Sequence, residues 1–475
     1  MSKQAFNPYL PSWEYIPDGE PHVFEDRVYV YGSHDRFNGH AYCLNDYICY
    51  SAPVDDLTDW RYEGVIYRKI DDPINEDGEM CLYAPDVTQG PDGRYYLYYV
   101  LDHVSIVSVA VCDTPAGKYE FLGYVHYADG TRLGDREGDQ PQFDPGVLTE
   151  GDKTYLYTGF SGPGDKSRFG AMGCVLAADM LTIIEDPVVV VPGPCYSEGT
   201  GFEGYEYFEA ASIRKCNDTY YFVYSGYSMH ELCYATSKDP MKGFTFGGVL
   251  VSNCDWNIDT YKPADMKTNY AGNNHGGMEC INGQWYIFYH RHTNGTCFCR
   301  QTVAEPITIA EDGSIAQVEL TSCGLNGGPL VGKGEYPAYI VCNIFSKSDV
   351  CNDPLHSSGW ISGHFARIMQ DGRDGDEELG YVANIRENSI VGFKYFDFNN
   401  VTRIGVKTRG YGNGVLEVKL TWDGETIVEI PVGYTNLFQW TYVDAKIPDG
   451  IHALYFEFKG EGGTTLGAFD LVVAE

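Results

Sequence analysis

The sequence has few positive charges. Its 475 residues include 33 Lys and Arg against 67 Asp and Glu, which gives a formal net charge of −34. Nucleic acids and anionic membranes bind proteins through basic surfaces that displace counterions. The charge balance therefore predicts that neither nucleic acid nor a membrane is a partner of this protein.

Long apolar runs are also missing. No run approaches the roughly 18 apolar residues that a membrane span needs, and residues 1–8 contain no apolar core of signal-peptide length. The 15 cysteines are an odd number in a long chain, and most lie in strand-like segments, where a reduced cysteine acts as a small apolar side chain. We therefore expect a cytoplasmic protein with reduced cysteines.

Helical periodicity is nearly absent, whereas aromatic residues are abundant, with 39 Tyr, 23 Phe and 7 Trp. Aromatic side chains favour β-strands. Many of the tyrosines belong to one motif, in which a polar turn is followed by alternating aromatic and aliphatic residues. Five copies recur at intervals of roughly 60 to 67 residues, at 26–31, 92–99, 152–157, 217–224 and 282–289.

This repeat predicts a β-propeller. Each copy is typical of the second strand of a hairpin, and the segments around it add up to three or four short strands per repeat. Five such units fit radial sheets around an axis better than a sandwich. We predict an all-β protein with a five-bladed β-propeller over residues 1–328.

The repeat stops near residue 330. The Gly-rich stretch 324–329 has the turn chemistry of a domain boundary. Beyond it the chain alternates again, with turns every 10 to 15 residues, which predicts a jelly-roll-like β-sandwich over residues 329–475. We expect the acidic stretch 370–378 to be a solvated loop.

Acidic residues precede four of the repeats. Asp18, Asp86, Asp144 and Glu209 each lie shortly before a copy of the motif, next to aromatic or aliphatic residues. The innermost strands of a propeller converge on its axis, so carboxylates from different blades can meet in one funnel. Because burying a carboxylate costs free energy, these positions indicate a functional role.

These motifs resemble those of glycoside hydrolase family 43, the arabinofuranosidases and xylosidases. The resemblance covers about two thirds of the chain and rests on Asn7-Pro8, Asp18, the Ala-Pro-Asp ending at Asp86, the Asp-Pro at Asp144 and the Glu-Ala-x-Ser-Ile beginning at Glu209. It implies an inverting, exo-acting glycoside hydrolase that releases xylose or arabinofuranose from short oligosaccharides.

The resemblance also implies roles for the acidic residues. Asp18 would be the general base, Glu209 the general acid, and Asp144 the residue that raises the pKa of the acid and orients it. Many family members have Asp-Pro at the base, whereas this sequence reads Asp18-Gly19-Glu20-Pro21. Glu20 is therefore a rival for the base.

Further residues match the family pattern outside the acidic positions. His275, in the Gly-rich segment 272–277, resembles the axial histidine that usually lies beside a water-coordinated calcium or other ion. Arg291 resembles a fifth-blade arginine that reaches substrate hydroxyls, and Asp86 and Phe208 are the other expected substrate contacts. No organic cofactor is expected, an oligosaccharide is the expected partner, and the sequence leaves a homo-oligomer open.

The C-terminal region resembles a family 6 carbohydrate-binding module. The likeness lies in segments 392–398, 414–418 and 450–456, but the closing segment 464–471 lacks the asparagine that commonly binds sugar in such modules. A scaffolding or active-site-shaping role is therefore an alternative to sugar binding by this domain.

Other functions remain open at this point. A glycosidase for another sugar, such as galactose, would use the same carboxylates. A non-catalytic sugar-binding propeller would be free to lose one of Asp18, Asp144 and Glu209, yet all three are present. The retaining five-bladed fructosidases are disfavoured, because their Trp-Met-Asn-Asp-Pro-Asn and Arg-Asp-Pro signatures are absent and only a Glu279-Cys280 pair remains.

Overall fold

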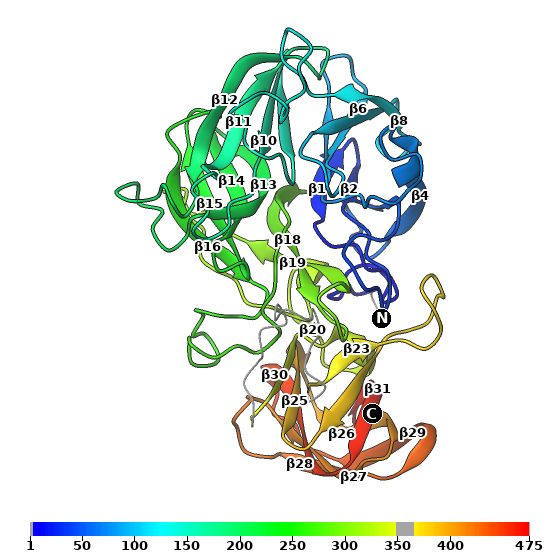
Figure 1. Ribbon diagram of the computed structural model, residues 1–475. Coiled ribbons are helices and arrows are strands. Elements are labelled where there is room, and N and C mark those ends of the chain that lie inside the picture. The colour runs from blue at the N-terminus through cyan, green and yellow to red at the C-terminus, as the bar shows by residue number, and fades with distance from the viewer. Residues whose placement is uncertain (1–2, 348–364, 475) are drawn as a thin grey trace.

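The computed structural model describes residues 3–347 and 365–474. Within these ranges, strands β1–β19 form five sheets and β20–β31 form two more. Short 3-10 helices lie in some of the connections between strands. Figure 1 shows the five sheets arranged around an axis and the two others packed below them as a sandwich. The predicted all-β fold, a five-bladed β-propeller followed by a β-sandwich, is confirmed.

Each of the first four blades is a four-stranded antiparallel sheet, and the fifth has three strands in the described chain. The strands of blades one and two are β1 (Glu20–Phe24), β2 (Arg27–Tyr31), β3 (Tyr47–Pro53), β4 (Arg61–Tyr67), β5 (Asp86–Gln89), β6 (Tyr95–Tyr99), β7 (Ser108–Cys112) and β8 (Glu120–Tyr124), with η1 (Lys69–Asp71) between the blades. Those of blades three to five are β9 (Gly146–Glu150), β10 (Lys153–Thr158), β11 (Gly170–Leu176), β12 (Ile183–Pro192), β13 (Tyr207–Cys216), β14 (Thr219–Gly226), β15 (Glu231–Ser237), β16 (Thr245–Ser252), β17 (Met278–Ile281), β18 (Gln284–His292) and β19 (Arg300–Ile307).

The repeated tyrosine motif forms the second strand of every blade, namely β2, β6, β10, β14 and β18. These strands are paired along both edges, and neighbouring blades cover both of their faces, so their aromatic side chains fill the gaps between blades. Tyr31 and Tyr99, for example, are fully buried in the apolar cluster that joins blades one and two. Similar clusters join the other neighbouring blades, which explains the tyrosine content as packing between blades.

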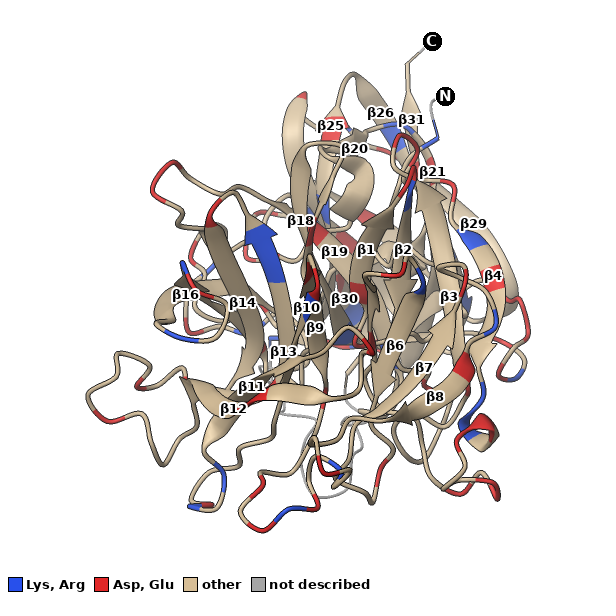
Figure 2. Cartoon of the chain, turned by 90° about the horizontal axis from the view of Figure 1, so that it is seen from above, with Lys and Arg blue, Asp and Glu red and all other residues tan. Residues whose placement is uncertain are grey.

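The first strands of the blades, β1, β5, β9, β13 and β17, contact one another in that order, and β17 contacts β1. The ring is therefore closed between the last blade and the first. Residues just before or within these five strands face the axis. Acidic residues elsewhere are spread over the turns and loops around the ring (Figure 2), where solvent hydrates them.

The sandwich consists of two six-stranded sheets around one apolar core. One sheet has the order β20-β25-β30-β27-β28 with β22 on β25, and the other has the order β23-β24-β31-β26-β29 with β21 on β31. Its elements are β20 (Leu330–Val331), β21 (Gly334–Pro337), η3 (Ala338–Ile340), β22 (Asn343–Ser346), β23 (Arg367–Met369), β24 (Tyr381–Arg386), β25 (Ser389–Phe398), β26 (Val401–Gly410), β27 (Asn413–Lys419), β28 (Val428–Val432), β29 (Thr435–Asp444), β30 (Gly450–Glu461) and β31 (Gly463–Val473), preceded by η2 (Gly324–Asn326).

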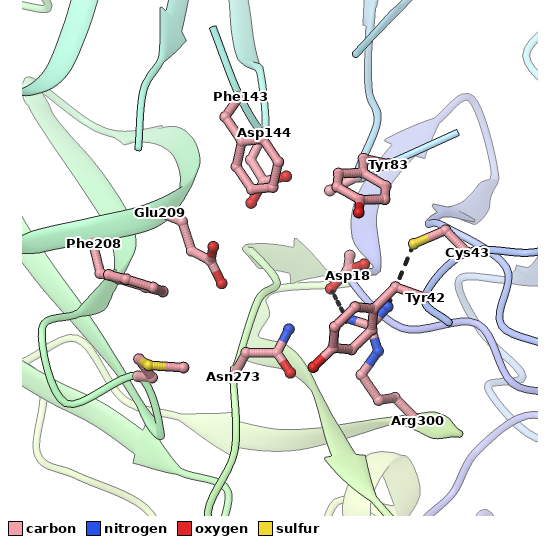
Figure 3. A pocket seen from close by; sticks show the side chains of 12 residues that line it. Asp18, Tyr42, Cys43, Tyr83, Phe143, Asp144, Phe208, Glu209, Asn273 and Arg300 are labelled. Carbon is pink, nitrogen blue, oxygen red and sulfur yellow. Dashed lines mark hydrogen bonds and ion pairs between the residues drawn. The ribbon is translucent and has the colours of Figure 1, made fainter. Parts of the chain in front are cut away.

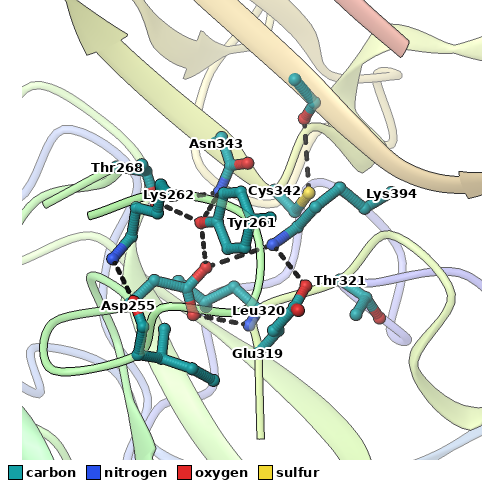
Figure 4. Close-up of polar contacts among 12 residues, drawn as sticks. Asp255, Tyr261, Lys262, Thr268, Glu319, Leu320, Thr321, Cys342, Asn343 and Lys394 are labelled. Atoms are coloured by element: carbon teal, nitrogen blue, oxygen red, sulfur yellow. Dashed lines mark hydrogen bonds and ion pairs between the residues drawn. The ribbon is translucent and has the colours of Figure 1, made fainter. Parts of the chain in front are cut away.

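The two domains are joined through a buried lysine. Lys394 of β25 is fully buried, and its ammonium forms ion pairs with Asp255 at 3.3 Å and with Glu319 at 3.0 Å (Figure 4). Both acids belong to the segments that connect to blade five. We propose the domain boundary near residue 328, because β19 ends at Ile307 and β20 already pairs with β25.

Two further findings bear on the expectations from composition. In the described parts of the chain, no helix is long and apolar enough to cross a membrane. The fourteen cysteines in these parts are all free thiols, and Cys351 lies outside the described residues.

Candidate active site

A pocket of about 220 Å³ opens at one end of the propeller axis. Figure 3 shows that its lining side chains come from several blades and point into a common space. Its described lining consists of Asp18, Tyr42, Cys43, Tyr83, Ala84, Phe143, Asp144, Phe208, Glu209, Met229, Asn273 and Arg300. The structure thus brings the three predicted catalytic carboxylates and Phe208 into one cavity.

Unusual backbone conformations direct the carboxylates into the pocket. Asp18 and Asp144 lie just before β1 and β9 and have positive φ angles of 58° and 44°. Glu209 lies in β13 beside Ala210, which has a φ of 70°, and the pairing of β13 with β14 shifts register on both sides of Glu209. A bulge of this kind turns a side chain out of the regular alternation of a strand. Strained backbone at these positions is typical of functional sites.

Asp18 is held by a cation and two hydrogen-bonding groups. Arg300 Nη1 lies 3.0 Å from its Oδ1, and the hydroxyl of Ser33 donates to its Oδ2. Burial by itself would raise the pKa of Asp18, but the charge of Arg300 outweighs burial and holds this pKa well below its ordinary value. Asp18 is therefore an ionised carboxylate at neutral pH.

His290 has a defined tautomer beside Asp18. Its Nε2 lies 2.7 Å from the carbonyl oxygen of Asn273, which only accepts hydrogen bonds, so Nε2 carries the proton. Burial lowers the pKa of His290 and keeps the ring neutral. Its Nδ1 then accepts a hydrogen bond from the backbone N–H of Asp18 at 3.2 Å, which fixes the backbone that carries the carboxylate.

Glu209 has the opposite electrostatic setting. Glu209 is only 8% exposed, and Phe208 and Asp144 line the same pocket (Figure 3). Burial is the main cause that raises the pKa of Glu209 well above its ordinary value, and the charge of Asp144 adds to it. The pocket thus favours the protonated form of Glu209 and the ionised form of Asp18.

Asp144 is connected to His275 behind the pocket. The Nδ1 of His275 lies 3.5 Å from Asp144 Oδ2, and its Nε2 lies 3.8 Å from Glu20 Oε1. Burial alone would lower the pKa of His275, but Asp144, Asp18 and Glu20 raise it to about 9. His275 therefore bridges two groups of carboxylates along the axis.

A second polar group, which we call the axial cluster, lies beyond His275 and consists of Glu20, His22, Asp86, Arg214 and Glu279. Arg214 forms ion pairs with Glu20 at 3.1 Å and Glu279 at 3.3 Å, and His22 Nε2 lies 2.6 Å from Asp86 Oδ1. Burial and the charge of Asp86 raise the pKa of Glu20 to about 7. Ligand atoms of Glu20, His22 and Asp86 lie within 4.8 Å of one another, as in a metal site.

The axial cluster accounts for two residues weighed from the sequence. Asp86 forms a hydrogen bond with His22 through Oδ1 and accepts one from the backbone N–H of Val147 at 2.8 Å through Oδ2. Glu20 accepts hydrogen bonds from Ser212 and Arg214. The described residues that line the pocket include neither Asp86 nor Glu20. Asp86 therefore does not lie in the substrate site where it was predicted. The geometry favours Asp18 over Glu20 as the base.

Arg291 also lies away from the predicted position. Its fully buried guanidinium donates to the carbonyl oxygens of Val341 and Cys342, at the sandwich side of blade five. Successive side chains of a strand point to opposite faces, so Arg291 points away from its neighbour His290, which contacts Asp18. Arg300 supplies the arginine of the pocket instead.

Sequence reasoning missed Arg300, Tyr42, Cys43 and Met229 as pocket residues. Arg300 begins β19 opposite His292 in β18, and only this register, which the sequence does not show, places it on the pocket face. Tyr42 and Cys43 lie in the connection between β2 and β3. Tyr83, Phe143 and Asn273 belong to motifs noted in the sequence, beside Asp86, Asp144 and His275.

Residues 18–315 match the family model of glycosyl hydrolases family 43. A xylosidase/arabinosidase of Thermoclostridium stercorarium is 66% identical over 473 residues, which cover 99% of this chain and 99% of that protein. A xylosidase/arabinosidase of Bacteroides ovatus is 27% identical over 348 residues, 66% of this chain and 97% of its own length.

Solved structures share the fold. A family 43 arabinoxylan arabinofuranohydrolase from Bacillus subtilis aligns with 98% of this chain and 97% of its own, with a TM-score of 0.52 and 19% identity. A family 43 β-xylosidase/α-arabinofuranosidase from a compost microbial metagenome aligns with 65% of this chain and 96% of its own, with a TM-score of 0.51 and 25% identity. Together with the family match over the propeller and the high identity along the whole chain, these likenesses show that the chain belongs to glycosyl hydrolase family 43 and is a glycosidase.

Proposed function

We propose that the chain is an inverting, exo-acting glycosidase that releases xylose or arabinofuranose from short oligosaccharides. The observation that carries this proposal is that one pocket holds two carboxylates in opposite settings, Asp18 paired with the cation of Arg300 and Glu209 buried without a cation partner among the described residues. General acid–base cleavage of a glycosidic bond needs one ionised and one protonated carboxyl group at the same pH, which these settings favour. The 66% identical relative, a xylosidase/arabinosidase, supports the choice of sugars.

In the proposed reaction Glu209 donates its proton to the leaving oxygen of the glycosidic bond. Asp18 accepts a proton from a water molecule as that water attacks the anomeric carbon from the opposite face of the sugar. The carbon–oxygen bond to the leaving group breaks while a bond to the water oxygen forms, so the configuration inverts. Arg300 keeps Asp18 charged in the ground state, and the charge of Asp144 keeps the proton on Glu209.

The size and lining of the pocket support exo action. A cavity of about 220 Å³ suits a single sugar unit better than a length of polymer. Aromatic residues Tyr42, Tyr83, Phe143 and Phe208 offer faces for stacking on a sugar ring, and Asn273 and Arg300 offer hydrogen-bond donors. We propose that Phe208 contacts the substrate in this way. The free thiols of the described cysteines support a reducing compartment, where imported oligosaccharides would be the substrates.

We also propose a calcium ion beside His275. Glu20 Oε1 and His275 Nε2 are buried, 3.8 Å apart, and have no hydrogen-bond partner among the described residues. Carboxylate oxygens with water molecules suit calcium, and Glu20 and Asp86 provide them. The compost relative was solved with xylotriose in a calcium-free form. When bound, the ion would supply positive charge on the axis.

Added calcium should raise the thermal midpoint of chelator-treated protein but not that of His275→Ala, and an unchanged wild-type midpoint would refute the site.

The activity is tested with aryl glycosides and product stereochemistry. Nitrophenyl β-xyloside and α-arabinofuranoside should be hydrolysed much faster than nitrophenyl β-galactoside. Proton NMR during the first minutes should show the anomer opposite to that of the substrate. Retention of configuration would refute the roles given to Asp18 and Glu209, and exclusive cleavage of the galactoside would refute the choice of sugar.

A further inference from the structure

One loop of the sandwich reaches the wall of the active-site pocket. Residues 370–378, which we call the acidic loop, follow β23 and extend from the sandwich beside the N-terminal part of the propeller (Figure 1). Asp374 in this loop accepts hydrogen bonds from the backbone N–H of Phe37 at 2.7 Å and from Nδ2 of Asn45 at 3.1 Å. Both donors belong to residues 34–46, the propeller loop between β2 and β3.

The propeller loop 34–46 is itself part of the pocket. Tyr42 and Cys43 line the cavity, and the guanidinium of Arg300 lies 4.7 Å from the centre of the Tyr42 ring (Figure 3). Asp35, at the start of the loop, is fully buried, pairs with Arg300 Nε at 2.9 Å and accepts from the backbone N–H of Cys43 at 3.0 Å. The position of this loop therefore decides where Tyr42 lies relative to Arg300.

Asp374 binds two residues of the propeller loop that lie on either side of Tyr42. Asn45 joins the two sides of the propeller loop, because its Nδ2 also donates to the carbonyl oxygen of Asp35 at 3.2 Å, and its Oδ1 accepts from Arg36 Nε at 3.2 Å. Phe37 lies on the opposite side of the loop from Asn45 in sequence. By binding both, one carboxylate fixes the spacing between the two ends of the segment that carries Tyr42.

The base of the acidic loop is anchored on both domains. Arg409 of β26 forms an ion pair with Asp371 at 2.8 Å, which ties the loop to the sandwich. The backbone N–H of Ile368 donates to the carbonyl oxygen of Thr293 in blade five at 2.7 Å. Met369 packs against the small apolar cluster of Tyr15, Phe37 and Cys299. The loop that carries Asp374 is therefore fixed at its base by contacts with both domains.

We propose that Asp374 is a positioning residue for substrate binding. It holds the propeller loop 34–46 so that Tyr42 forms one side of the sugar pocket, and the sandwich thereby completes the binding site of the propeller. This inference rests on the proposed function and deepens it. Asp374 is exposed, so removing its carboxylate takes away two hydrogen bonds without opening a cavity in either domain.

The kinetic test compares two substitutions in the acidic loop. Asp374→Ala should raise KM for the nitrophenyl sugar by about tenfold, because the two hydrogen bonds that hold the propeller loop are lost, with kcat within about twofold and an unchanged thermal midpoint. Glu378→Ala removes the same charge from an exposed position in the same loop and should leave KM unchanged. An unchanged KM in Asp374→Ala, or an equal rise in Glu378→Ala, would overturn the proposal.

A double-mutant cycle and hydrogen exchange separate positioning from other effects. Asn45→Ala should raise KM as well, and the double variant Asn45→Ala/Asp374→Ala should lose less than the sum of the two single losses, because the two side chains share one contact. Full additivity would contradict the shared contact. Amide exchange in residues 34–46 should speed up in Asp374→Ala and stay unchanged in Glu378→Ala.

The exchange measurement does not depend on activity. If the wild type hydrolyses neither xyloside nor arabinofuranoside, the proposed function fails, yet the exchange result still decides whether Asp374 holds the loop. If the wild type is active and exchange in residues 34–46 is the same in Asp374→Ala as in the wild type, the positioning role fails alone.

Discussion

The propeller axis carries two layers of polar groups, and every blade contributes to each layer, with blade three contributing only a backbone N–H to the second. In the pocket layer these are Asp18, Tyr83, Asp144, Glu209 and Asn273. In the axial cluster the corresponding positions are Glu20, Asp86, the backbone of Val147, Arg214 and Glu279. In each blade the two positions are only a few residues apart in the sequence, within or shortly before the first strand. His275 contacts both layers.

The difference between the layers lies in how their polar atoms are used. In the axial cluster one arginine is shared by two carboxylates, and Asp86 accepts from two blades. Its groups are therefore engaged in holding the ring together. In the pocket layer Glu209 faces the open cavity, and burial and the charge of Asp144 favour its protonated form. The same residue types hold the blades together where they share partners across the ring, and they supply chemistry where one faces the open pocket.

The largest expected effect comes from breaking the base in the pocket layer. Asp18→Asn should lower kcat by about 10⁴-fold, because an amide cannot accept the proton of the attacking water. The loss should be similar for good and poor leaving groups, since the base does not act on the leaving oxygen. Steady-state kinetics with nitrophenyl and unsubstituted disaccharide substrates measures it. A loss that disappears with the better leaving group would assign Asp18 a different role.

Replacing the acid should separate the two carboxylates of the pocket layer. Glu209→Gln should lower kcat by about 10³-fold on a disaccharide, because the leaving sugar needs a proton. With a dinitrophenyl glycoside, whose leaving group departs as an anion, most of this loss should vanish. Circular dichroism should show an unchanged fold. Equal losses on both substrates would remove Glu209 from the role of acid.

In the axial cluster the corresponding change should affect stability first. Arg214→Met leaves Glu20 and Glu279 buried without their cation, which should cost about 3–5 kcal/mol of unfolding free energy. The double variant Arg214→Met/Glu20→Gln should recover part of this, because one of the stranded charges is removed. Urea unfolding at pH 7 measures both. A single variant as stable as the wild type would mean that the cluster does not hold the blades.

The sequence reveals the architecture more completely than the site. The tyrosine motif predicts the blades because side chains of period two must fill both faces of a central strand, and the carboxylates stand out because acids are costly in such strands. Arg300 could not be chosen over Arg291 without the pairing of β18 with β19. The contact between Asp374 and residues 34–46 joins segments more than 300 positions apart, and no local pattern encodes it.

The smallest expected effect is a shift in the pH profile that tests the coupling within the pocket layer. The negative charge of Asp144 raises the pKa of Glu209, so activity should fall as pH rises through that pKa and Glu209 loses its proton. Asp144→Asn removes the charge, lowers the pKa of Glu209 and should move the basic limb of kcat to lower pH by about one unit, or about 1.4 kcal/mol. Asp86→Asn removes a charge from the axial cluster and should leave this limb nearly in place, because the main charges that raise the pKa of Glu209 are those of Asp144 and Asp18. If both variants shift the limb equally, the two layers are one electrostatic unit, and their separation into chemistry and structure is wrong.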